Sequence, residues 1–371
     1  MKLKYLTNVL ENLAPAQYQM SFDNSGLLVG HPEDQVEKVL CTLDVTDEVM
    51  DEAQDIGADC IVAHHPLIFQ SLKRITGQTP TERLVVRAIR HGIAVYGIHT
   101  NLDQVAWGVN DRLAQAIGLT DTQILKPEKH TLKKLVTFCP DMNANDGTYY
   151  PGAIRQALFD AGAGQIGSYD QSSFNAEGKG TFRAPENSQP FVGNQSRMHV
   201  QDEVRIETVF PAPQQGAVIK ALTGAHPYEE VAYDVYPLDN TFKAVGAGMI
   251  GHLPEPREEM AFLQELKRNL NAPGIRHTAL TGQPVQKVAI CGGAGRFTLP
   301  DAIKQGADAL VTSDFKYHDF FDVDQHLLLA DIGHYESEQF TPELLYNHIG
   351  SQLPEVTAAI SACNTNPIHY L

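Results

Sequence analysis

Residues 61–69, IVAHHPLIF, form an apolar run that is interrupted by two adjacent histidines and a proline. A short apolar run of this kind is typical of a strand that is buried on both faces. Adjacent side chains of a strand point to opposite faces, so His64 and His65 can share a site only if Pro66 ends the regular strand. Because burying two imidazoles without partners is costly, we interpret the pair as candidate ligands. Hydrogen-bonded core histidines are the alternative.

Strands and helices alternate on both sides of this run. The pattern predicts strands at 38–45, 59–69 and 93–103, and helices at 46–57, 83–92 and 108–118. Thr46 is a typical N-cap residue, and Gly92 is a typical residue to end a helix. Continuous apolar strands that alternate with helices predict a mostly parallel sheet with helices on both faces.

The same alternation returns near the C-terminus. It predicts strands at 286–295, 308–315 and 327–336, and helices at 299–307, 318–326 and 340–350. The two halves resemble each other loosely, for example DCIVAHHPLI beside DALVTSDFKY. An internal repeat and a chance resemblance between two sets of α/β strands are both open interpretations.

The segment between the halves has a different pattern. Strand, helix, a polar stretch at 168–193, then strand, helix and strand follow one another, which is the split βαβ pattern of a ferredoxin-like module. The polar stretch is rich in Gly, Ser, Asn and Pro, as in a surface hairpin. We therefore predict a discontinuous α/β domain, 1–126 with 244–371, into which an α+β domain, 127–243, is inserted.

Composition excludes several classes of function. The 371 residues carry a formal net charge of −17, so no excess of cations is available for bulk nucleic-acid binding. No run of about 18 apolar residues predicts a membrane span, and the N-terminus has no signal-peptide pattern. Five scattered cysteines are typical of free thiols in a reducing cytosol, so we expect a cytoplasmic protein.

Polar side chains gather where the predicted strands end. They are His64, His65, His99, Asn101, Asp103, His334, Glu336 and Glu338. Since ligands bind outside the carboxyl ends of parallel strands, we expect several of these groups to converge. Imidazoles with carboxylates suit a pair of divalent cations, and one carboxylate can bridge two ions. Taken alone, His99 is more typical of a hydrogen-bonded core or rim residue than of a ligand.

Other motifs point less clearly to chemistry. CGGAG at 291–295 lacks the spacing of a dinucleotide fingerprint or a P-loop, so a structural turn is the simpler interpretation. His318 is either a helix cap or a neighbour of the site. No G-x-S-x-G motif is present, which disfavours covalent acyl transfer.

Six motifs in this order resemble the family of NGG-one-interacting-factor-three-like proteins, whose members also carry the name GTP cyclohydrolase 1 type 2 homologue. They are FDNSGLLVG (22–30), DVTDEVMDEA (44–53), AHHPLIF (63–69), GIHTNLD (97–103), SDFKYHD (313–319) and GHYESE (333–338). The middle segment also resembles the insert of the long bacterial members. That insert has a ferredoxin-like fold similar to PII signalling and divalent-ion tolerance proteins.

The resemblance implies a dinuclear metal centre in each subunit. Matching motif by motif, the implied metal ligands are His64, His65, Asp103, His334 and Glu338. It places His99 and His318 in the cavity around the metals, with possible roles in proton transfer. Glu336 competes with Glu338 for the last ligand position. The resemblance further implies a toroidal homo-hexamer with the metal centres facing an internal cavity.

These observations support two functional hypotheses from different classes. The first is a metal-dependent hydrolase of a small-molecule substrate, with two divalent ions (zinc, iron or manganese) that activate a shared water. GTP cyclohydrolase activity rests on the family name alone, because no nucleotide-binding motif is readable. The second is a non-enzymatic metal-handling or regulatory protein whose PII-like insert binds an effector.

Overall fold

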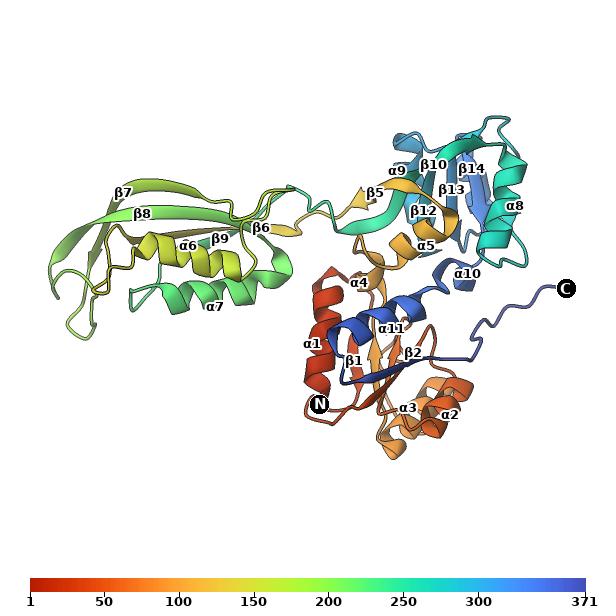
Figure 1. Ribbon diagram of the computed structural model, residues 1–371, viewed down its shortest axis with the longest axis horizontal. Coiled ribbons are helices and arrows are strands. Elements are labelled where there is room, and N and C mark those ends of the chain that lie inside the picture. Colours follow the sequence, from red (N-terminus) through yellow and green to blue (C-terminus); the bar gives the residue numbers. More distant parts are fainter. The chain divides into compact units, whose positions relative to one another are not determined.

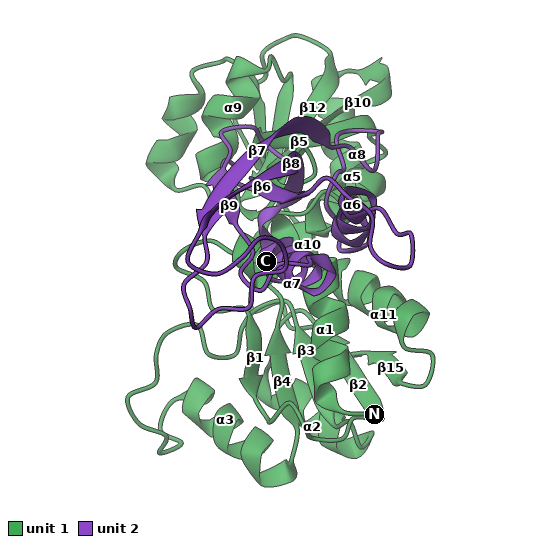
Figure 2. Ribbon diagram, turned by 90° about the vertical axis from the view of Figure 1, so that its left-hand side faces the viewer, with its two compact units in different colours: residues 1–127, 243–371 green, residues 128–242 purple.

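The computed structural model describes residues 1–371 and divides the chain into two compact units. Unit 1 consists of residues 1–127 and 243–371, and unit 2 consists of residues 128–242 (Figure 2). Figure 1 labels the helices and strands of both units. Unit 1 contains two sheets and unit 2 contains one.

The first sheet of unit 1 is almost entirely parallel. Four strands run parallel and one edge strand is antiparallel, in the order β1 (Gly26–Val29), β4 (Ala94–Gly97), β3 (Cys60–Ala63), β2 (Lys38–Thr42), β15 (Thr357–Ile360). Successive side chains alternate between two buried faces, as expected for a central parallel sheet. Val39 and Val62 pack with one apolar cluster, and Leu40 and Ile61 pack with another.

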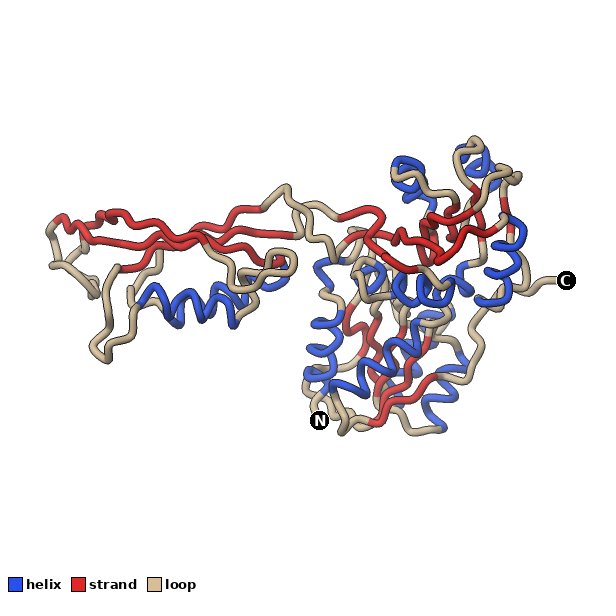
Figure 3. The backbone as a smooth tube through the Cα atoms, turned by 45° about the horizontal axis from the view of Figure 1, so that its top comes forward, coloured by secondary structure: helices blue, strands red, loops and turns tan.

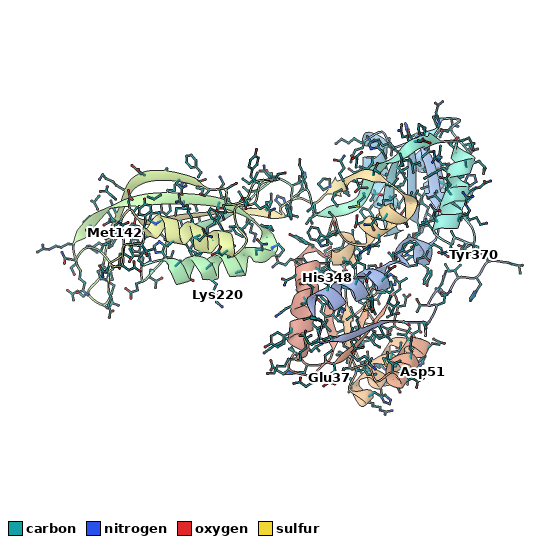
Figure 4. The ribbon with its side chains drawn as sticks, viewed as in Figure 1. Glu37, Asp51, Met142, Lys220, His348 and Tyr370 are labelled. Atoms are coloured by element: carbon teal, nitrogen blue, oxygen red, sulfur yellow. The ribbon has the colours of Figure 1, made fainter.

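Helices cover both faces of this sheet. One face packs against α1 (Leu3–Leu13) and α11 (Thr341–Gln352), and the other packs against α2 (Asp47–Asp55) and α3 (Pro80–His91). Nε2 of His348 in α11, a residue labelled in Figure 4, lies 3.4 Å from the carbonyl oxygen of Val9 in α1.

Two predicted helix ends are confirmed. The Thr46 hydroxyl accepts a hydrogen bond from the Val49 amide and caps α2. Gly92 ends α3 with a left-handed φ of 66°, a conformation that favours glycine.

Several predicted strands are too long, and the one at 327–336 ends at Asp331. β3 ends at Ala63, so His64 and His65 follow the strand and do not lie within it. Their amides still donate to the carbonyls of Thr42 and Leu43, after which Pro66 has no N–H to continue the pairing. β4 likewise ends at Gly97 and is followed by the one-turn helix α4 (Thr100–Asp103).

The second sheet of unit 1 is mixed. Its order is β11 (Arg276–His277), β14 (Leu328–Asp331), β13 (Ala309–Ser313), β12 (Val285–Ala294), β10 (Gly246–Arg257), β5 (Thr120–Pro127). Only β12, β13 and β14 run parallel to one another. The expectation of mostly parallel sheets therefore holds for the first sheet alone, because β5, β10 and β11 join the second as antiparallel strands.

Helices also cover both faces of the second sheet. On one face lie α5 (Val109–Ile117) and α8 (Glu259–Asn269), and on the other α9 (Leu299–Lys304) and the 3-10 helix η4 (Tyr317–Val323). The helix predicted at 318–326 is therefore a shorter 3-10 helix. None of the helices is both long and apolar enough to cross a membrane.

Unit 2 follows the order β6 (Leu132–Pro140), α6 (Tyr150–Asp160), β7 (Phe174–Arg183), β8 (Met198–Pro211), α7 (Gln215–Ala225), β9 (Tyr233–Pro237). Its antiparallel sheet has the strand order β7-β8-β6-β9, with β7 and β8 forming a long hairpin. Both helices pack on one face of the sheet (Figure 3), where Ile154 and Val218 meet Leu135 and Ile206.

Candidate metal centre

Side chains from three strand ends of unit 1 converge on one point. His64 and His65 follow β3, His99 and Asp103 follow β4, and His334 and Glu338 lie on α10 (His334–Glu338) after β14. Their ligand atoms form three overlapping groups, each with all atoms within 4.8 Å of one another: His64, His65 and His99; His65, His334 and Glu338; His64, Asp103 and Glu338.

Glu338 is shared by two of these groups. Its Oε2 lies 3.1 Å from Nε2 of His65 and 3.1 Å from Nε2 of His334. Its Oε1 lies 3.8 Å from Nε2 of His64, which is itself 3.6 Å from Oδ1 of Asp103. The two oxygens of one buried carboxylate therefore face two different sets of donors.

Three atoms at this point are buried without any hydrogen-bond partner. They are Nε2 of His64, Oδ1 of Asp103 and Oε2 of Glu338. An unpaired buried polar atom costs roughly 1–3 kcal/mol, and more when it is charged. Divalent cations at the two donor sets would satisfy all three, and an N/O donor set without thiolate is suited to such ions. The residues present thus fit a divalent metal ion.

Each converging histidine is held by its other ring nitrogen. Nδ1 of His65 lies 2.7 Å from a carboxylate oxygen of Asp44. Nδ1 of His334 lies 2.6 Å from a carboxylate oxygen of Asp314, and Nδ1 of His99 lies 2.8 Å from one of Asp23. Nδ1 of His64 lies 2.8 Å from the carbonyl oxygen of Ile98. These partners orient the rings so that every Nε2 is left for the centre, as in many metal sites.

The three supporting aspartates are the residues that sequence reasoning missed. Asp44 and Asp314 lie just after β2 and β13, and Asp23 precedes β1. The available signal was a carboxylate next to a strand end inside a matched motif. Sequence alone cannot show which histidine such a carboxylate reaches.

The carboxylates of the centre have opposite pKa shifts. Burial, reinforced by the negative charge of Glu338, raises the pKa of Asp103. Burial would also raise the pKa of Glu338, but the imidazoles of His64, His334 and His65 outweigh it and hold that pKa well below its usual range. The centre therefore keeps a negative charge on Glu338 where its two donor sets meet.

The pKa values of the histidines are also shifted in opposite directions. Burial lowers the pKa of His64. Burial also opposes the charged form of His65 and His334, but Asp44 and Asp314, together with Glu338, raise their pKa values to about 10 and about 11. These two imidazoles therefore carry protons that a metal ion must displace.

The remaining sequence-predicted residues occupy distinct places. Glu336 is also buried, but its Oε1 accepts a hydrogen bond from Asn366 at 3.0 Å, so the geometry favours Glu338 as the ligand. Asn101 accepts from the His99 amide at 2.9 Å. His318 is exposed on η4 against Tyr317 and Phe321, and it belongs to none of the three groups.

The CGGAG turn lies beside Glu338. Gly293 has a φ of 61°, and a Cβ atom there would lie 2.4 Å from Oε1 of Glu338. Its amide donates to the hydroxyl of Ser337 at 2.8 Å. This turn therefore leaves room for the shared carboxylate and holds the helix that carries it.

The C-terminal segment also reaches the centre. The Thr365 hydroxyl donates to Oδ2 of Asp44 at 2.6 Å, while Oδ1 of the same carboxylate holds His65. Asn366 binds Glu336, and Figure 4 labels Tyr370 near the end of the segment. The segment thereby orients the Asp44 carboxylate, which in turn orients the candidate ligand His65.

Comparison with known proteins agrees with this arrangement. A family profile described as Duf34/NIF3 (NGG1p interacting factor 3) matches residues 1–367. The chain belongs to this family. The resemblance seen in the six motifs is thereby confirmed, since a single family covers almost the whole chain.

Relatives with the same name in several organisms match over nearly their full length. The GTP cyclohydrolase 1 type 2 homolog of Bacillus subtilis is 37% identical over 372 residues, covering 99% of this chain and 98% of its own. That of Halalkalibacterium halodurans is 36% identical over 368 residues, covering 98% and 97%. These relatives therefore match the chain over nearly its full length.

Solved structures show the same fold. A Bacillus cereus protein related to NIF3 superimposes with a TM-score of 0.85 at 38% identity, over 100% of this chain and 99% of its own. A Staphylococcus aureus protein gives a TM-score of 0.77 at 30% identity, over 100% and 99%. The mixed α/β architecture with several sheets and flanking helices is thus that of NIF3 structures.

Proposed function

We propose that this centre binds two divalent metal ions. One would be held by His65, His334 and Glu338, and the other by His64, Asp103 and Glu338. The observation that carries the proposal is the buried carboxylate of Glu338, whose two oxygens face the two donor sets. Imidazole and carboxylate donors suit zinc, iron or manganese and do not choose among them.

We propose further that the protein is a metal-dependent hydrolase of a small molecule. Bound divalent ions would lower the pKa of water and polarise the substrate. His99 stands beside His64 and His65, and Asp23 holds its Nδ1, so its Nε2 is free to exchange a proton with substrate. Asp44 and Asp314 keep His65 and His334 oriented throughout. His318 remains a proposed contributor to proton transfer.

The name of the relatives suggests GTP as one substrate to test. Incubation of the metal-loaded protein with GTP, followed by chromatography, should then yield a formamidopyrimidine or pterin product. Absence of any product would remove GTP and leave the wider hydrolase proposal to a screen of phosphoesters, amides and cyclic amidines.

Elemental analysis tests the metal proposal directly. Purified protein should contain two equivalents of divalent metal, and the variants His65→Ala and Asp103→Ala should each contain less. Glu336→Gln is a matched control, because Glu336 is buried nearby but faces Asn366. Unchanged metal content in both test variants would overturn the proposal.

The alternative is a metal-handling or regulatory protein, with unit 2 as a PII-like, ferredoxin-like module that binds an effector. A cavity in unit 2 favours this second hypothesis. A metal carrier should release its ions to an acceptor protein, whereas an enzyme should lose turnover on chelation. We also propose that the protein is cytoplasmic and forms a homo-hexamer. Light scattering of the purified protein would test the hexamer.

A further inference from the structure

Unit 2 contains a cavity of about 650 Å³, which is within the range of small-molecule sites. Its lining comes from β7 with the loop after it, from β6 and β8, and from residues 228–232. None of these residues belongs to the metal centre, so the cavity is a feature that the proposed hydrolase does not explain.

Missing side chains on the edge strand β7 create this space. Gly178 lies directly opposite Glu203 of β8, so the two positions share a face of the sheet. A Cβ atom added at Gly178 would meet nothing within 4 Å, whereas one added at Gly180 would lie 2.1 Å from Oε2 of Glu203. The two glycines thus leave a floor on which the Glu203 carboxylate is the main polar group.

Aromatic rings form the walls around that carboxylate. The Tyr228 hydroxyl donates to Oε1 of Glu203 at 2.9 Å, and the ring of Phe191 lies 6.2 Å from that of Tyr228. Phe138 and Phe182 complete the aromatic lining. Phe138 already holds one cation, since the guanidinium of Arg205 lies 5.9 Å from its ring centre.

The charges of the lining are not balanced. Lys179 pairs with Asp202 at 2.6 Å, and Arg205 pairs with Glu207 at 2.9 Å, a carboxylate that it shares with Lys134. Neither carboxylate lines the cavity. Arg183 is the remaining lining cation and forms no ion pair. The lining carboxylates form no ion pair either, and they are Glu177, Glu203, Glu229 and Glu230. The unpaired charge of the cavity is therefore negative.

We propose that this cavity binds a small organic cation, an ammonium group with apolar substituents, with Glu203 as its counter-ion. Aromatic faces attract such cations through their quadrupoles, and a carboxylate in the floor supplies the opposite charge. An anionic ligand such as a nucleotide would meet the Glu203 carboxylate in the floor, in a lining that has more unpaired carboxylates than unpaired cations, which disfavours it.

Calorimetric titration of the full-length protein with tetramethylammonium, choline and agmatine tests the proposal. At least one should bind saturably, and 3,3-dimethylbutan-1-ol, the neutral isostere of choline, should bind more weakly than choline. Glu203→Gln should lower the affinity about tenfold or more, the effect of losing a charged partner. Glu186→Gln, in the loop after β7 but outside the lining, should not.

A cavity-filling pair of variants separates ligand binding from folding. Gly178→Leu should abolish binding, because a Cβ atom at this position meets nothing within 4 Å and the side chain would lie on the same face of the sheet as Glu203. Gly216→Leu, another exposed glycine of unit 2 with no neighbour within 4 Å, should bind normally. Binding by none of the three cations, equal binding of the neutral isostere, or preferential binding of ATP would each overturn the proposal. Metal content, measured on the same samples, should be unchanged, so the outcome is independent of the proposed hydrolase.

Discussion

The two parallel strand triplets of unit 1, β2-β3-β4 and β12-β13-β14, share the same local framework. The Asp59 carboxylate accepts from the amides of Glu37 and Lys38, at 2.8 and 2.9 Å. The carboxylate of Asp308 accepts from the amides of Gln286 and Lys287, at 2.9 and 2.7 Å. These matched contacts favour an internal repeat over a chance resemblance.

The triplets differ in the residues at the carboxyl end of each strand. The first triplet supplies His64 and His65 after β3, whereas β13 of the second is followed by Asp314, which holds His334 of the same triplet. The second triplet supplies both of its candidate ligands, His334 and Glu338, from the single helix after β14. The chemistry at the strand exits therefore differs between the triplets, while the framework that places the exits is the same.

Glu338 joins the two triplets, so its replacement should have the largest effect on the centre. Glu338→Gln keeps the shape but removes the shared negative charge, and divalent-metal affinity should fall by more than about 100-fold. Loss of a mere hydrogen-bonding partner of a ligand already costs about 10–100-fold. Elemental analysis and competition with a chelating dye would measure the change.

The control for that prediction is Glu336→Gln. Glu336 lies two residues earlier on the same helix and is also buried, but it binds Asn366 of the C-terminal segment. Its variant should retain its metal. Equal loss of metal from both variants would show that the helix, and not the shared carboxylate, determines binding.

Much of this arrangement was predictable because strand exits can be read from where apolar runs end. The runs around residues 38–45 and 59–69 predict the sheet, and the polar residues after them predict ligands at its edge. The exact end of β3 was not predictable, because Ile68 and Phe69 continue the apolar pattern after Pro66. Ile68 instead packs against an apolar cluster of unit 1 and Phe69 is exposed, so tertiary contacts decide the conformation of this stretch.

Other features depend on contacts between distant segments. Asp44 reaches His65 and Thr365 only in the folded chain, so no local pattern assigns its role. The antiparallel strands β5 and β10 pair although they are separated by all of unit 2. The cavity of unit 2 arises because two glycines of β7 face Glu203, which requires the register of the hairpin.

Metal affinity should depend steeply on pH, because one histidine of each triplet, His65 and His334, is protonated before metal binds. The pKa values of His65 and His334 are raised to about 10 and about 11, so binding at pH 8 should release about two protons. Affinity should then fall about 100-fold from pH 8 to pH 7. Calorimetry in buffers of different ionisation enthalpy counts the protons, and a release near zero would contradict the prediction.

The metal-free protein should show the opposite pH dependence. Its raised histidine pKa values stabilise the folded state fully below the unfolded pKa of about 6.5, and this contribution is lost as pH rises through about 10 and 11. Thermal melting of chelated protein should therefore show a falling midpoint above about pH 6.5, and a rising midpoint would contradict the assignment.

Loss of the matched aspartate should reduce the stability of the protein equally in both triplets. Asp59→Ala and Asp308→Ala each remove a carboxylate that accepts two backbone amides, and each should destabilise the protein by about 2 kcal/mol. Thermal melting of the metal-free variants would measure both changes. A large difference between them would mean that the matched contacts are not energetically equivalent, and the repeat would then be one of geometry alone.

The smallest expected effect comes from the hydroxyl of Thr365, which binds an aspartate of the first triplet only. Asp44 of the first triplet is held by Thr365, whereas no such hydroxyl binds Asp314 of the second. Thr365→Val removes this hydroxyl with little change of shape, so His65 should lose orientation and metal affinity should fall by about tenfold or less, the low end for an indirect partner. Thr365→Ser, which restores the hydroxyl, should recover the affinity. If the serine variant binds as weakly as the valine variant, packing of the C-terminal segment, and not the hydrogen bond to Asp44, sets the affinity.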